Sequence, residues 1–175
     1  MASNKMSLSM HRLLFASLAV TAWFVPAGQC GSAAAEVAVD KTAPSLVLTE
    51  LNGGTFDLAK LRGKVVLVTY WATWCAPCRK EMPVIDAFYR RYHERGLEVI
   101  GISADRPQDF AKMRKMSRAL AYPTATLDQI TDNGFGPPEG FPLTYVIDPS
   151  GTIRDKFIDV REPLLRDVVL PLLPN

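Results

Sequence analysis

The sequence predicts a single α/β domain in which a central mixed β-sheet is flanked by helices. Residues 65–71 (VVLVTYW) form a continuous β-branched and aromatic run, which is typical of a strand covered on both faces. Strand patterns then alternate with helical patterns and end in a hairpin, which predicts three layers. The chain has 175 residues, of which 48% are hydrophobic and 22% charged, and this suits one domain of ordinary size.

The first half of the domain is predicted from its turn signals and apolar spacing. Residues 45–51 alternate weakly and Thr55-Phe56 begins a return strand, so that Asn52-Gly53-Gly54 closes an N-terminal β-hairpin. A turn around Gly63 leads into the strand at 65–71. A helix is expected from Cys75 to about Glu94, with a Gly96 cap and with inward residues at helical spacing, namely Met82, Ile85, Tyr89 and Tyr92.

The second half continues the alternation. A strand is expected at 97–102, a helix from Pro107 with Asp105 as its cap, and a short strand at 122–127. Residues 132–140 are rich in Gly and Pro and predict a loop. The remaining patterns predict a hairpin and a closing helix, at 143–147, 152–158 and 162–173.

The N-terminal residues predict a targeting signal. Lys5 and Arg12 precede thirteen apolar or small residues at 13–25, and the first 27 residues contain no acid. Small or apolar residues flank a cut after Ala27, so residues 1–27 are expected to be a cleaved secretory signal. An uncleaved anchor and a lipid-modified Cys30 are the alternatives. Residues 28–42 are expected to form a flexible tether, and residues 43–175 the domain, in an extracytoplasmic compartment such as the periplasm.

Composition excludes several classes of protein. The formal net charge is +2, and both surplus charges lie in the first 27 residues, so the rest of the chain carries no excess of cations for nucleic acid. Three cysteines are too few for a disulfide-rich scaffold. Two histidines are too few for a metal cage built from imidazoles. No metal is therefore expected, and no cofactor is expected either.

The chemistry is expected at Trp74-Cys75-Ala76-Pro77-Cys78, between the buried strand and the helix. A thiolate at a helix N-terminus faces unpaired backbone N–H groups, and these should lower the pKa of Cys75 below the ~8.5 of a free thiol. Cys78 lies one turn later, within disulfide reach. Cys75 can attack a disulfide in a partner protein, and Cys78 can then resolve the mixed disulfide.

Two other uses of the cysteine pair are less well supported. A zinc site needs two further ligands, and His93 lies about 22 Å away along the same helix, while Cys30 lies outside the domain. A purely structural disulfide would close a loop of only four residues, which restricts the unfolded chain little.

Residues 63–83 (GKVVLVTYWATWCAPCRKEMP) closely resemble the TlpA/ResA-like thioredoxin family of thiol:disulfide oxidoreductases. The resemblance runs from about Ala43 to the C-terminus. It implies a thioredoxin fold, in which residues 97–127 supply the strand and helix inserted in this family. It also implies that Gly140-Phe141-Pro142 is the cis-proline loop, with the Phe141 backbone facing Cys75 and available to a substrate chain.

Other residues around the cysteines are assigned by position. Trp74 is expected to flank and shield the sulfur, and Trp71 to belong to the core. Pro77 limits the flexibility between the two cysteines. Thioredoxins resemble one another in a buried Asp six residues before the first Cys, where this chain has Thr69. Glu81 is a candidate replacement as proton acceptor, although we expect its position three residues after Cys78 to face solvent. Some relatives carry an acid between the cysteines, where this chain has Ala76.

The resemblance implies an extracytoplasmic reductase of protein disulfides. Its expected substrates are apocytochrome c or copper-site proteins, its electrons would come from a membrane thiol donor, and it is expected to be a monomer. Alternatives are an oxidant or isomerase and a copper-carrying chaperone, although carriers of that kind resemble one another in Cys-x-x-x-Cys with a distant His. Peroxiredoxins resemble one another in Pro-x-x-x-Thr-x-x-Cys, a pattern that neither Cys75 nor Cys78 completes.

Overall fold

The computed structural model describes residues 37–174, and the predicted signal and Cys30 lie outside them. The main sheet has five strands in the order β5-β4-β3-β7-β8. β3 (Val65–Trp71), β4 (Leu97–Ser103) and β5 (Thr124–Thr126) are parallel, whereas β7 (Leu143–Ile147) and β8 (Ile153–Phe157) are antiparallel to their neighbours. The predicted central strand is therefore confirmed, with β4 on one side of it and β7 on the other.

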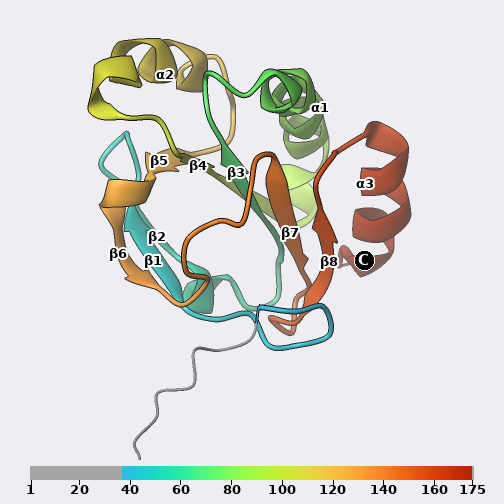
Figure 1. Cartoon of the computed structure of the whole chain (residues 1–175). Coiled ribbons are helices and arrows are strands. Elements are labelled where there is room, and N and C mark those ends of the chain that lie inside the picture. Colours follow the sequence, from blue (N-terminus) through green and yellow to red (C-terminus); the bar gives the residue numbers. More distant parts are fainter. Residues whose placement is uncertain (1–36, 175) are drawn as a thin grey trace, which may run out of the picture. The chain divides into compact units, whose positions relative to one another are not determined.

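Alternate residues of β3 enter two separate hydrophobic clusters. Val65 and Leu67 pack with side chains of α1 (Ala76–Tyr92) and α3 (Glu162–Val169). Val66, Val68 and Tyr70 pack on the other face with β1 (Leu46–Thr49) and β2 (Thr55–Asp57). Figure 1 shows α1 and α3 on one side of the main sheet and the small sheet on the other. The continuous apolar run arises because β3 is covered on both faces.

The small sheet contains a strand that the sequence pattern does not predict. It has the order β2-β1-β6, and β6 (Ile130–Asn133) pairs antiparallel with β1. The predicted hairpin of β1 and β2 is confirmed. Residues 132 and 133, expected in a loop, belong to β6. Their side chains are exposed at a sheet edge, so they carry no apolar alternation.

The helices largely follow their predicted spacing. α1 is extended by a 3-10 turn at His93–Arg95 and ends at Gly96, whose φ of 89° is the left-handed conformation expected of a glycine cap. The insertion after β4 is a 3-10 turn (Pro107–Asp109) followed by α2 (Phe110–Ser117). The assignment of Asp105 as the cap of this helix is wrong, because its carboxylate binds other residues.

Residues 40–43 lie against the end of the domain remote from α1. Asp40 N donates to Ile153 O at 2.7 Å, Ile153 N donates to Lys41 O at 2.9 Å, and Ala43 N donates to Gly151 O at 2.8 Å. Ordered pairing thus begins before residue 43, within the stretch expected to be a tether. Among residues 37–174, no helix is long and apolar enough to span a membrane.

Candidate functional site

Cys75 and Cys78 form a disulfide at the start of α1, with their Cα atoms 5.3 Å apart. Cys75 is the N-cap of the helix, and Cys78 N donates to Cys75 Sγ at 3.2 Å. Only 5% of Cys75 is exposed, and none of Cys78. The more exposed of the two cysteines is therefore also the one whose sulfur accepts a hydrogen bond from the first turn, which favours a thiolate at Cys75 after reduction.

Three aromatic side chains lie near the disulfide. Trp74 is 58% exposed, and its ring meets that of Phe141 edge-to-face at 5.5 Å. Trp71 is fully buried and packs with Ala72, Cys75 and Cys78. The expected division between a core Trp71 and an exposed Trp74 beside the cysteines is thus observed.

The Phe141–Pro142 peptide bond is cis, which confirms the prediction for this loop. Pro142 is buried and precedes β7, whose first residue, Leu143, pairs with Tyr70 near the end of β3. The antiparallel pairing of β7 with β3 therefore brings this loop to the edge of the sheet where α1 begins. Ala76 and Pro77 are exposed in the first turn of α1.

Asp105 holds the loop in front of Cys75, a role that the sequence analysis does not identify. Its buried carboxylate accepts hydrogen bonds from Thr73 N at 3.1 and 3.0 Å and from Thr73 Oγ1 at 2.7 Å. Ser103 Oγ also donates to it at 2.7 Å. On the other side of the loop, Thr73 O accepts from Arg79 at 2.7 Å and from Lys112 Nζ at 3.4 Å. Both the backbone N–H and the backbone C=O of Thr73 are therefore hydrogen-bonded, which holds the chain in place two residues before Cys75.

Glu81 is buried, so the expectation that it faces solvent is wrong. It is only 4% exposed, because it lies on the same face of α1 as Cys78 and Met82. Its Oε2 accepts from Val160 N at 3.0 Å, and its Oε1 has no partner in the described part of the chain. Burial raises the pKa of Glu81 to about 7, the Val160 hydrogen bond opposes this rise, and nearby Asp159 adds to it. Thr69 accepts a hydrogen bond from Thr144 Oγ1 at 2.8 Å, and its hydroxyl does not ionise.

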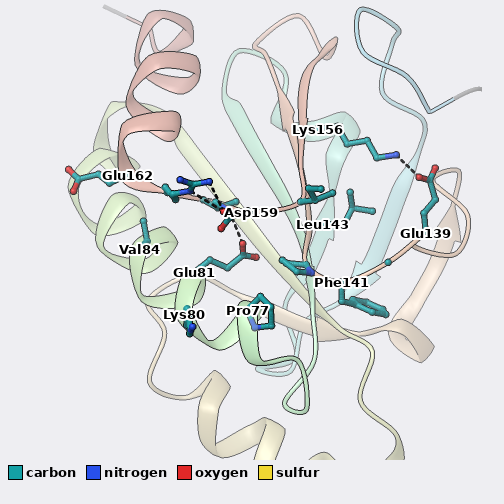
Figure 2. Close-up of a pocket in the computed structure, with 15 residues that line it drawn as sticks. Pro77, Lys80, Glu81, Val84, Glu139, Phe141, Leu143, Lys156, Asp159 and Glu162 are labelled. Atoms are coloured by element: carbon teal, nitrogen blue, oxygen red, sulfur yellow. Dashed lines mark hydrogen bonds and ion pairs between the residues drawn. The ribbon is translucent and has the colours of Figure 1, made fainter.

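A groove of about 900 Å³ opens beside the disulfide. Figure 2 shows Glu81 pointing into it, with Pro77 and Phe141 at one end and Lys156 and Glu139 beyond them. The connection between β8 and α3, at Ile158–Arg161, supplies the opposite wall. This wall is not predicted from the sequence, since no motif marks it.

The arrangement combines a disulfide at a helix start, a cis-proline loop and a buried carboxyl group one turn after Cys78. It is suited to thiol–disulfide exchange with a chain laid along the groove. Among residues 37–174, no group of three or more His, Cys, Asp or Glu side chains is placed to hold a metal ion.

Comparison with known proteins also indicates thiol–disulfide exchange. A model of the AhpC/TSA family matches residues 39–156. The thiol-disulfide oxidoreductase ResA of Bacillus thuringiensis (strain Al Hakam) is 36% identical over 124 residues, which is 69% of each chain. A thiol:disulfide interchange protein of Chlorobium tepidum TLS is 29% identical, with a TM-score of 0.65 over 78% of this chain and 99% of that one. The thioredoxin domain of a thiol-disulfide oxidoreductase from Bacteroides vulgatus is 27% identical, with a TM-score of 0.65 over 79% and 99%.

Proposed function

Since the chain belongs to the AhpC/TSA family, and within it to the TlpA/ResA-like thiol-disulfide oxidoreductases, we propose that it reduces protein disulfides outside the cytoplasm. The observation that carries the proposal is the Cys75–Cys78 disulfide at the N-terminus of α1, beside the cis-proline loop. The N-terminal signal pattern supports the location. Cytochrome c haem-attachment cysteines and copper-site cysteines are the proposed substrates.

The first step is attack by the Cys75 thiolate on one sulfur of the substrate disulfide. The substrate S–S bond breaks, a Cys75–substrate disulfide forms, and the departing substrate sulfur takes up a proton. The hydrogen bond from Cys78 N supports the negative charge on Cys75 before the attack. We propose that the backbone of Phe141, which precedes the cis proline and whose ring contacts Trp74, pairs with the substrate chain next to the mixed disulfide.

Cys78 then resolves the intermediate. Its thiol loses a proton and attacks Cys75 Sγ, so the Cys75–Cys78 bond forms, the Cys75–substrate bond breaks, and the second substrate sulfur leaves as a thiolate that takes up a proton. The substrate has gained two electrons and two protons, which the cysteine pair has lost. A thiol donor restores them, and we propose a membrane protein in this role.

Glu81 is the proposed proton acceptor for Cys78. It lies one turn further along the buried face of α1, and the chain has Thr69 where thioredoxins resemble one another in a buried Asp. A carboxyl group with a pKa of about 7 can both accept and release a proton near neutral pH.

The reduction potential tests the direction of the reaction. The protein carrying Cys30→Ser is equilibrated in graded glutathione or dithiothreitol buffers, and the Cys75 and Cys78 thiols are counted by mass tagging. A potential below about −220 mV is expected of a reductase, whereas a value near about −120 mV would make the protein an oxidant. Cys78→Ser is the control that cannot close the disulfide.

The substrate proposal needs a separate comparison. A cyclised Cys-x-x-Cys-His peptide and a scrambled disulfide peptide of the same composition are offered to the reduced protein. We expect faster reduction of the former. Equal rates would contradict the cytochrome c assignment while leaving the reductase activity intact.

A further inference from the structure

The segment that contains α2 carries a concentrated positive charge on its surface. Residues 106–118 contain a single acid, Asp109, and five exposed cations, which we call the cationic face: Arg106, Lys112, Arg114, Lys115 and Arg118. The rest of the domain has no such excess, because acids and bases balance over the chain beyond residue 27.

The cations of this face have no acidic partner and lie close together in the sequence. None of the five forms an ion pair with an acidic side chain of residues 37–174, whereas seven Lys and Arg side chains on other surfaces do. Some other cations, such as Arg62 and Arg91, are also unpaired, but among the described residues only this stretch holds five of them within thirteen residues. Lys112 and Lys115, and likewise Arg114 and Arg118, are neighbours on the helix surface, and like charges at these spacings destabilise a helix.

Favourable interaction with the helix dipole accounts for only part of the set. Arg114 and Lys115 lie in the last turn of α2, where cations are stabilised by the carbonyl end of the helix. Arg106 precedes the helix and Lys112 lies before its last turn, so neither gains from this effect. The helix dipole therefore does not account for the cluster as a whole.

The cationic face adjoins the disulfide. Met113 is buried in one cluster with Cys75, Cys78 and Met82, so α2 packs directly behind the cysteines. Lys112 Nζ reaches Thr73 O, which also accepts from Arg79 of α1. Figure 1 shows α2 at the same end of the molecule as the start of α1. Lys112 therefore places one end of the cationic face beside Thr73, two residues before Cys75.

We propose that the cationic face docks an acidic segment of the partner protein, next to the cysteines that exchange with Cys75. The inference rests on the proposed disulfide exchange and narrows its substrates to proteins with Asp and Glu near the reacting disulfide. Attraction between the cationic face and an acidic segment steers the two proteins together and raises their association rate. Salt screens the charges and weakens this effect. The groove on the other side of Cys75, lined by both acids and bases, would then receive the substrate backbone.

The test compares three cyclic disulfide peptides with one common core, flanked by acidic, neutral or basic residues. The full chain carrying Cys30→Ser is reduced, and its second-order rate with each peptide is measured at 20 and 500 mM salt. The test variant combines Arg114→Gln, Lys115→Gln and Arg118→Gln. The control variant combines Lys41→Gln, Lys60→Gln and Arg166→Gln, which removes the same charge from exposed positions outside the cationic face.

At the lower salt concentration we expect the acidic peptide to react about tenfold faster than the basic one, within the range of electrostatic steering. The test variant should lose most of this ratio and the control variant should keep it, while the neutral peptide reacts equally with all three proteins. Equal rates for acidic and basic peptides, or equal losses in both variants, would overturn the docking proposal but leave the exchange function standing. Failure of the unaltered protein with all three peptides would overturn both.

A membrane surface is the competing partner for these cations. Binding of the unaltered protein to phosphatidylserine vesicles is therefore measured beside the peptide rates. Vesicle binding that the test variant loses, with no discrimination among the peptides, would assign the face to lipid and overturn the proposal.

Discussion

Glu81 has one carboxylate oxygen bound to Val160 N and one without a partner in the described part of the chain. Burying a carboxylate with half of its hydrogen-bonding capacity unused disfavours the charged form, and this is why the pKa of Glu81 rises to about 7. Glu81 can therefore bind and release a proton near neutral pH, and its ionisation lowers the free energy of unfolding.

Glu81→Gln should remove a pH dependence of stability. The pKa of the folded state, about 7, lies above the ordinary value of 4.5, so the folded protein binds more protons between these values and loses stability as pH rises through them. For the oxidised protein we expect the free energy of unfolding to fall by about 2 kcal/mol between pH 5 and 8 through this group alone. Urea titrations at several pH values measure the slope. Glu94→Gln, at an exposed position, should keep it, and an unchanged slope in Glu81→Gln would contradict the assignment.

The position of Glu81 illustrates what can be inferred from spacing. The inward residues of α1 are predicted from Met82, Ile85, Tyr89 and Tyr92, and Cys78 begins the same stripe. A residue three positions after Cys78 falls on that stripe, so the helical period does contain the information that Glu81 is buried. The negative charge of Glu81, by contrast, favours an exposed position in contact with water. The partner that overcomes this argument, Val160 N, is 79 residues away and carries no sequence signal.

At the scale of elements, the connection between β4 and α2 is fastened to the connection between β3 and α1. Asp105 belongs to the first and Thr73 to the second, and three donors converge on one carboxylate. Because the strands are parallel neighbours, their carboxyl ends lie together, and the two connections meet where α1 begins.

Asp105→Ala should destabilise the protein by about 2–4 kcal/mol, since it leaves buried donors of Thr73 and Ser103 without an acceptor. Urea unfolding measures this loss. The reaction of Cys75 with a small thiol reagent in the reduced protein should change too, because Thr73 sets the path of the chain into the helix. Asp109→Ala is the matched control, since its side chain caps nothing, and it should stay within about 0.5 kcal/mol. Equal free energies of unfolding for Asp105→Ala and Asp109→Ala would contradict the proposed role of Asp105.

Elements with strong periodic signals are the ones predicted well. β3, α1 and the β7–β8 hairpin combine an apolar pattern with a turn or cap residue, so that local and tertiary preferences agree. β6 is missed because Thr131, Asp132 and Asn133 are exposed and polar, and only their pairing with β1 makes them a strand. The cap assigned to Asp105 is wrong for a related reason, since a carboxylate before a helix has the same local pattern whether it caps that helix or binds a distant loop.

For the molecule as a whole, residues 37–43 are part of the folded unit. A protein that starts at residue 44 lacks three backbone hydrogen bonds to the β7–β8 hairpin and the packing of Val37 against the core. Its free energy of unfolding should be lower than that of a protein starting at residue 37 by about 1–3 kcal/mol. Thermal and urea unfolding of the two proteins measure the difference. Lys41→Ala should have little effect, because Ile153 N donates to the backbone carbonyl of Lys41 and not to its side chain. Identical stabilities of the two proteins would show that this pairing contributes nothing.

The hydrogen bond from Val160 to Glu81 also has a consequence for synthesis, because the site is complete only after residue 160 has been added. The cysteines, their helix and the carboxyl group have all left the ribosome long before residues 141–160, which provide the second neighbour of β3, one wall of the groove and the donor to Glu81. Contacts at such sequence separation form late. From residue 78 until residue 160 is added, a growing chain therefore carries both cysteines without the surface that selects a partner for them, and selectivity is acquired only with the last few dozen residues.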